Sequence, residues 1–334
     1  MNMESEGKMF SAKSLVKCLA IGAALTFSMT SRAEYPNKPI RVVVPYAAGG
    51  TTDAISRMIG EKLSGKLGQP VVVENKPGGS EQVAMSYVKL APADGYTIVI
   101  STVGGLSVNP SLYGSKLSYN PQKDLVPVVL AASLPSVFFV NPSVPVKTLD
   151  ELTDYLKKNP GKVNYGSSGP GQPSHLAMEL YKSLTGVDVN HVPYKGGAPA
   201  LQDLAAGHVQ VMVAIGAEGM PFVKAGKLKA LAVTTATRTP LFPELVPAAE
   251  SKGMKGFEMP TWYGYLVKTG TSNAIVHRLN VAFNEVLQDK DLRKKMNEMG
   301  IEVLGGTPQD LDARIKQDTV KWGKVVHDAH ITLE

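Results

Sequence analysis

The chain has 334 residues, a formal charge of +6 at neutral pH and a single cysteine, Cys18. The first 33 residues carry four basic and two acidic side chains. Their removal leaves about +4, too little positive charge to predict nucleic-acid binding. It also leaves no cysteine, which excludes disulfides, a thiol nucleophile and cysteine metal ligands. The remaining roughly 300 residues suffice for two domains with cores of their own.

The N-terminus has the pattern of a secretory signal peptide. Three lysines precede a short apolar run at 18–29, and Ser31-Arg32-Ala33 fits the small-x-small rule for cleavage. We therefore predict a signal peptide at 1–33 that is cut after Ala33. The alternative is a retained N-terminal anchor, although the run is short for a membrane span.

The first elements predicted after this segment are a strand, a glycine turn and a helix. A β-branched run at 42–44 leads into a turn with Gly49 and Gly50, after which apolar side chains recur with helical spacing. Backbone N–H groups at such a turn, together with the helix dipole, favour an anion. The plainer interpretation is an ordinary strand-to-helix connection with Thr51 or Thr52 as the N-cap.

Strand-like and helix-like segments alternate from Ile40 to the end of the chain, which predicts an α/β fold. Further strands are expected at 71–74, 96–101, 163–166, 189–193, 209–215, 228–234 and 262–267. Capping residues predict that helices begin at Thr148, Ser174, Ser272 and Thr307.

Two segments are predicted to cross between lobes. The apolar run at 126–140 is unusually long for one strand, and the strand at 262–267 is interpreted as the return crossing. The chain therefore divides into one lobe from 34–135 plus 259–334 and a second, inserted lobe from 136–258.

The inserted lobe repeats the pattern of strand, glycine loop and helix. Its strand at 163–166 enters the loop 167–173, and Ser174 is predicted to cap the next helix. Ligands bind at the carboxyl ends of strands in such sheets, and both glycine turns fall at these ends. We therefore expect the two turns to face each other across one cleft.

Motifs of common enzyme and cofactor sites are absent. The chain has no phosphate-loop, dinucleotide-binding or HExxH pattern, so we expect no cofactor and no metal. The segment 166–169 resembles a serine nucleophile turn without meeting GxSxG. A hydrolase with Ser168 as nucleophile and His175 or His191 as base stays an alternative, because a triad is defined by geometry. His175 is expected instead to be structural or a hydrogen-bond donor to a ligand.

Asp53 falls in the first turn of the first helix, where an acidic side chain is electrostatically favoured. It would repel a carboxylate at the same helix N-terminus. We therefore expect any contact with a ligand to run through water, a ligand hydroxyl or an ammonium group.

At this point the sequence resembles a known family, the tripartite tricarboxylate transporter receptors, also called Bug or TctC-like proteins. The resemblance covers essentially the whole mature chain. It rests on the segments 45–53, 67–78, 93–97, 165–169, 175–179, 191–200 and 225–234. It implies an α/β fold of the periplasmic binding protein type II. Each of two lobes has a mixed, mostly parallel sheet flanked by helices, and the ligand cleft lies between the lobes.

The resemblance also implies which residues bind the ligand, because in the family the two glycine loops grip one carboxylate, partly through water. From the first lobe it implies Tyr46, Ala48, Gly49, Thr51, Thr52 and Asp53, with Ser101 and Thr102 in the wall. From the second lobe it implies Ser167, Ser168, Ser174 and His175, with Tyr194, Lys195 and Gly197 nearby.

The sequence departs from the family pattern after Pro77-Gly78, where members usually continue with a run rich in glycine and alanine. Here polar Glu81 and Gln82 stand in that run. The plainer interpretation is a resurfaced loop. The sharper one is a changed pocket wall, which makes Glu81 and Gln82 specificity residues for a ligand unlike citrate.

The function implied by the resemblance is a periplasmic solute-binding receptor and not an enzyme. We expect it to close on a small organic carboxylate, a dicarboxylate or an aromatic carboxylate, and to deliver it to the membrane permease subunits of a tripartite transporter. We also expect a monomer without nucleic-acid partners. A receptor that reports its ligand to a membrane sensor kinase is an alternative, and the serine hydrolase is a less favoured one.

Overall fold

A computed structural model describes residues 35–194, 196–259, 261–329 and 331. The predicted signal peptide, 1–33, lies outside this range. The chain divides into the units Met1–Asn37 and Lys38–Glu334, and the fold below belongs to the second unit. In the part of the chain that is described, no helix has both the length and the apolar composition of a membrane span.

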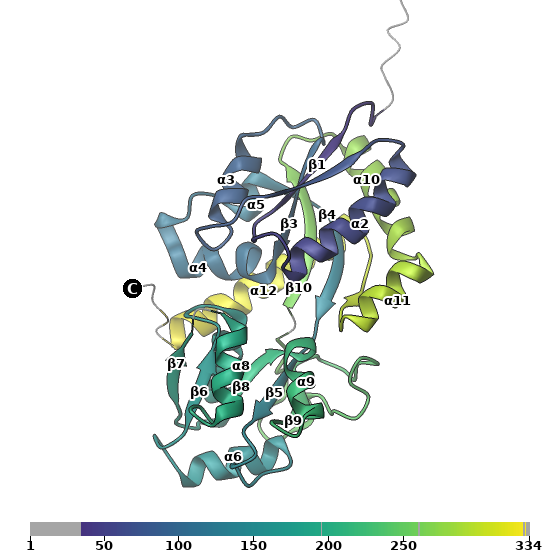
Figure 1. The fold of residues 1–334 in the computed structure, drawn as a ribbon. Helices are drawn as coiled ribbons and strands as arrows, with labels where there is room; N and C mark the ends of the chain where they lie inside the picture. Colours follow the sequence, from purple (N-terminus) through teal and green to yellow (C-terminus); the bar gives the residue numbers. More distant parts are fainter. Residues whose placement is uncertain (1–34, 195, 260, 330, 332–334) are drawn as a thin grey trace, which may run out of the picture. The chain divides into compact units, whose positions relative to one another are not determined.

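Two sheets organise this unit. The first has six strands in the order β11-β4-β10-β3-β1-β2 (Figure 1). Its strands are β1 (Ile40–Val44), β2 (Val71–Asn75), β3 (Thr97–Thr102), β4 (Leu125–Leu134), β10 (Thr261–Lys268) and β11 (Glu302–Val303). The second has five strands in the order β7-β6-β8-β5-β9. Its strands are β5 (Ser136–Val140), β6 (Asn164–Ser167), β7 (Asn190–Pro193), β8 (Val211–Ile215) and β9 (Lys229–Val233).

The chain passes between the sheets where the sequence predicts. The apolar run at 126–140 splits at Pro135 into β4 of the first sheet and β5 of the second. After β9 the chain returns to the first sheet at β10. All strands of the second sheet fall within 136–258, so we keep the division into lobes of 34–135 plus 259–334 and 136–258 as a proposal.

Both sheets are mixed, as expected, but they are less parallel than expected. The parallel pairs are β1 with β2 and β3, and β6 with β7 and β8. The crossing strands β4, β5 and β10 pair antiparallel with their neighbours. A strand that carries the chain from one sheet to the other runs against the strands of the regular strand-helix-strand units, which explains the difference.

Helices cover the sheets, and several begin at the predicted caps. They are α2 (Thr51–Leu67), α3 (Gln82–Leu90), α4 (Asn109–Tyr113), α5 (Pro121–Asp124), α6 (Leu149–Lys158), α7 (Pro173–Thr185), α8 (Gly197–Ala206), α9 (Gly216–Lys224), α10 (Asn273–Leu287), α11 (Lys290–Glu298) and α12 (Pro308–Asp328). Short turns are η1 (Gly104–Val108), η2 (Gly114–Lys116) and η3 (Ala248–Glu250). The side chains of Thr148, Ser272 and Thr307 cap α6, α10 and α12, as predicted.

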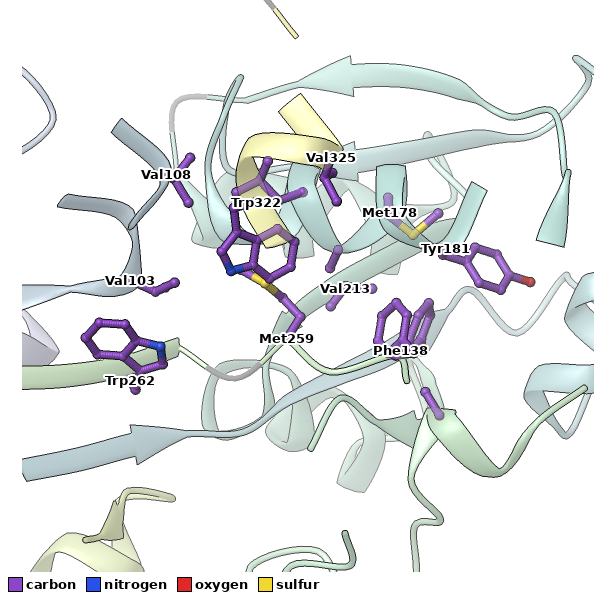
Figure 2. Packing of buried hydrophobic residues seen from close by; sticks show 14 of the residues in the cluster. Val103, Val108, Phe138, Met178, Tyr181, Val213, Met259, Trp262, Trp322 and Val325 are labelled. Atoms are coloured by element: carbon purple, nitrogen blue, oxygen red, sulfur yellow. The ribbon is translucent and has the colours of Figure 1, made fainter. Parts of the chain in front are cut away.

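One buried apolar cluster extends through both sheets. It contains Val43 and Val99 of the first sheet together with Phe138 and Val213 of the second. Figure 2 shows part of this cluster around Trp322 of α12. The same helix contacts η1 and β4 on one side and α7 on the other. Because α12 belongs to the last part of the chain, it joins the end of the sequence to the inserted segment.

Candidate functional site

A pocket of about 350 Å³ is lined by residues from both proposed lobes. The wall from the first lobe consists of Tyr46, Gly50, Thr51, Thr52, Thr261 and Tyr263. The wall from the second consists of Ser136, Ser168, Gln172, Pro173, Ser174, Gly197, Met212, Val213, Ala214, Ile215 and Glu218. Its size falls within the range of small-molecule sites.

Four helices begin at this pocket: α2, α7, α8 and α9. None of the four has a side chain that caps its N-terminus. Of the helices with nine or more residues that begin elsewhere, α6, α10, α11 and α12 have side-chain caps and α3 does not. Capping by a side chain would occupy the N–H groups of the first turn. In the four pocket helices no side chain occupies these donors, although Gly216 N of α9 donates to Pro135 O at 2.9 Å and Pro173 of α7 has no N–H.

This arrangement favours an anion in the pocket. Each helix N-terminus carries a partial charge of about +0.5, and its first N–H groups form a ready anion site. A carboxylate can accept hydrogen bonds from several such groups at once. The convergence of four N-termini therefore supplies positive potential from the backbone itself.

The predicted N-caps of α2 and α7 are wrong, because in both helices the predicted residue lies inside the first turn. The residue before α2 is Gly50, so Thr51 and Thr52 lie inside the first turn. The residue before α7 is Gln172, and Ser174 also lies inside the first turn. The Ser174 hydroxyl instead accepts a hydrogen bond from Ser168 N at 2.8 Å. These side chains thus line the pocket where caps would have closed the helix ends.

Aromatic hydroxyls form part of the wall from the first lobe. The Tyr46 hydroxyl donates to Glu81 Oε1 at 2.7 Å. Tyr263 lies on β10, and burial above all raises its pKa to about 12, with smaller contributions from Glu81 and Glu218. Tyr263 is therefore a neutral hydroxyl at the pocket.

The Asp53 carboxylate is used inside the protein. It accepts hydrogen bonds from Gly49 N, Arg57 Nε and Asn75 Nδ2, each at 2.9 Å. The hydrogen bond from Arg57, with those from Gly49 and Asn75, lowers the pKa of Asp53 to about 2 although burial opposes this. Asp53 is buried and does not line the pocket. The hydrogen bond from Gly49 N holds the glycine turn against the first turn of α2.

The structure brings some of the predicted residues to the pocket and not others. Tyr46, Thr51, Thr52, Ser168, Ser174 and Gly197 line it. The residues that do not line it are Ala48, Gly49, Asp53, Ser101, Thr102, Ser167, His175 and Tyr194. Lys195 lies outside the described residues.

Two histidines near the second glycine loop, His175 and His191, stack on each other. Their ring centroids are 4.1 Å apart, and Tyr165 stacks on His191. His175 Nδ1 accepts a hydrogen bond from Gly171 N at 3.0 Å, and burial lowers the pKa of His175 to about 4. His191 Nε2 lies 2.6 Å from the Ser167 hydroxyl, which is fully buried. Through these hydrogen bonds the two histidines support the second glycine loop, and neither of them lines the pocket.

Glu81 and Gln82 do not line the pocket, contrary to the sharper interpretation of the sequence. Glu81 is buried and accepts hydrogen bonds from Ser101 and Thr102 at 2.5 Å, as well as from Tyr46. A Cβ at Gly105 would lie 2.2 Å from its carboxylate, so this glycine makes room for it. Gln82 accepts a hydrogen bond from Ser118 N. Glu81 therefore acts on the pocket through Tyr46, and Gln82 faces another part of the surface.

Sequence reasoning missed the contribution of β8, α9 and β10. The segment Val211–Glu218 is a third strand that passes through a glycine into a helix, so the same pattern was present in the sequence. Thr261 and Tyr263 had no comparable signal, because they lie at the start of an apolar crossing strand, away from its carboxyl end.

The two mixed sheets and the pocket with four helix N-termini are those of an α/β solute-binding protein. The chain matches the family model described as "Tripartite tricarboxylate transporter family receptor", TctC, over residues 55–331, and it belongs to this family. The family and the fold class expected from the sequence are thereby confirmed.

Relatives match along nearly the whole chain. A UPF0065 protein from the tcbD-tcbE intergenic region of Pseudomonas sp. strain P51 is 38% identical over 310 residues, which is 92% of this chain and 91% of the relative. The structure of R. palustris Rpa4515 with adipate has a TM-score of 0.77 at 37% identity and covers 90% of this chain and 99% of that one. MatC from Rhodopseudomonas palustris with bound malate has a TM-score of 0.73 at 31% identity, covering 87% and 100%.

Proposed function

We propose that this receptor captures a small organic carboxylate in the pocket and delivers it to the permease of a tripartite transporter. The observation that carries the proposal is the convergence of four uncapped helix N-termini on one pocket. A carboxylate there would accept hydrogen bonds from backbone N–H groups and from the hydroxyls of Thr51, Thr52, Ser168 and Ser174.

The relatives support carboxylates as the ligand class. Rpa4515 was solved with adipate and MatC with malate, and both ligands are dicarboxylates. The pocket walls are polar at the helix ends and apolar along β8, at Met212, Val213 and Ala214. A short aliphatic or aromatic acid has the matching combination of a charged end and an apolar body.

We propose direct contact with the ligand for Tyr46, Thr51, Thr52, Ser168, Ser174 and Gly197. Ala48, Gly49, Asp53, Ser101, Thr102, Ser167, His175 and Tyr194 are proposed to support the two loops. Tyr194, for example, donates to Asp203 Oδ2 at 2.8 Å. Lys195 keeps its place as a proposed contact on the sequence alone.

Location and partners follow from the family and from the N-terminal pattern. We propose export by the signal peptide at 1–33, a monomer in the periplasm, and closure of the lobes on the ligand. A sensor kinase in place of the permease would use the same pocket. The hydrolase is less well supported, because the Ser168 hydroxyl pairs with the Ser174 hydroxyl at 2.7 Å and the serine beside His191 is buried.

A thermal-shift screen of the mature chain against carboxylic acids tests the proposal. A ligand at a hundred times its Kd adds about 2.7 kcal/mol to the free energy of unfolding, which raises the melting temperature by a few degrees. We expect at least one mono-, di- or aromatic carboxylate to produce this shift, while the amide of the same acid produces none. If no carboxylate stabilises the protein more than its amide does, the proposal is wrong.

A further inference from the structure

Among the described residues that line the pocket, Glu218 is the one with an acidic side chain. It lies in the first turn of α9, and its Oε2 would be 2.8 Å from a Cβ at Gly197, the first residue of α8. Its carboxylate therefore lies beside the N-termini of both α8 and α9. Tyr263, in the opposite wall, lines the same pocket as Glu218.

Glu218 differs from Asp53 and Glu81, two buried carboxylates that do not line the pocket. Asp53 has three hydrogen-bond donors, and Glu81 has three hydroxyl groups. Among the described residues, Glu218 has no hydrogen-bond or ion-pair partner. It is exposed at the pocket, yet neighbouring protein atoms desolvate its carboxyl enough to raise its pKa. A cation at this position would stabilise the charged form.

The charge of the pocket also favours a cation next to Glu218. Four helix N-termini together supply about +2 in partial charges, and an ionised Glu218 removes one unit at one end. Among the described residues that line the pocket, none is a lysine, arginine or histidine. A ligand that is anionic throughout would face Glu218 with like charge at its second end. A ligand with a carboxylate at one end and a positive group near Glu218 matches both.

We propose that Glu218 is a specificity-determining residue that binds an ammonium group, so that the ligand is a carboxylate carrying an amino group. This inference rests on the proposed function, because it assumes that the pocket holds a carboxylate. One carboxylate of the ligand lies at the N-termini of α2 and α7. At the other end of the ligand, the ammonium group donates to Glu218, and the carboxylate on the same carbon accepts a hydrogen bond from Gly197 N at the start of α8.

Matched pairs of acids that differ by one amino group test this inference by titration calorimetry. The pairs are succinate with aspartate, glutarate with glutamate, and adipate with 2-aminoadipate. For the length that fits, we expect the wild-type protein to bind the aminated acid at least tenfold more tightly than the plain one. Glu218→Gln should weaken binding of the aminated acid about tenfold or more and leave binding of the plain acid equal or tighter.

Glu244→Gln serves as the control, because Glu244 is exposed and does not line the pocket. It should change neither affinity. If plain and aminated acids bind equally and Glu218→Gln alters neither, the role of Glu218 is refuted while carboxylate capture stands. If none of the six acids binds but another carboxylate does, the amino-acid class is refuted. If no carboxylate of any kind binds, the proposed function fails as well.

Discussion

Replacing Thr51 by Asp is expected to weaken carboxylate binding about a hundredfold without lowering the stability of the unliganded protein. Thr51 is the first residue of α2 and lines the pocket. A new carboxylate about 5 Å from a ligand carboxylate costs about 3 kcal/mol at an effective dielectric constant near 20. The same charge is favourable at a helix N-terminus, by about 0.3–1 kcal/mol. Affinity and stability should therefore change in opposite directions, which calorimetry and thermal unfolding measure separately.

Asn273→Asp provides the matched control. Asn273 is the exposed first residue of α10, a helix that begins away from the pocket. It should give the same small gain in stability and no change in affinity. If Thr51→Asp binds the ligand as tightly as the wild type does, the N-terminus of α2 is not where the carboxylate lies.

Replacing Asp318 by Ala is expected to lower the free energy of unfolding by about 3–5 kcal/mol, the usual cost of removing one partner from a buried ion pair. Asp318 lies on α12 with 2% of its surface exposed. It accepts hydrogen bonds from Trp262 Nε1 at 2.6 Å and from Arg314 Nε at 2.8 Å. Its loss would leave a buried indole N–H without an acceptor where α12 meets β10. Chemical denaturation with guanidinium chloride measures the change.

A second ion pair on α12 is the control for this prediction. Asp312 pairs with Lys316 at the same i,i+4 spacing, but both side chains are exposed. Asp312→Ala should cost less than about 1 kcal/mol. Equal losses for the two variants would contradict the role assigned to the buried pair.

Much of the fold could be predicted because its signals are local. Strand, glycine turn and helix follow one another within 42–67, and a capping residue stands directly before its helix at Thr148, Ser272 and Thr307. The crossing near Pro135 was also visible, because an apolar run of that length exceeds one strand. The excess of antiparallel pairing was not visible, since the direction of a crossing strand depends on which neighbours it finds in space.

The details of the site were harder to predict, because they depend on partners far apart in the sequence. Asp53 and Glu81 both occur in glycine-rich segments. In the structure, however, the Asp53 carboxylate accepts hydrogen bonds from Asn75 and Arg57, and the Glu81 carboxylate accepts them from two hydroxyls of β3. Glu218 had no distinguishing signal in the sequence. Only the approach of α8 and α9 to the same pocket distinguishes it.

The most direct test of the central claim is the change in backbone amide chemical shifts when the carboxylate with the largest thermal shift is added. If the helix N-termini hold the carboxylate, the amide protons of Thr51, Thr52, Ser174 and Gly197 should move downfield, because hydrogen bonds to an anion deshield them. The amides at the capped start of α10 should stay in place. Shifts confined to other parts of the protein, with these four amides unchanged, would contradict the account.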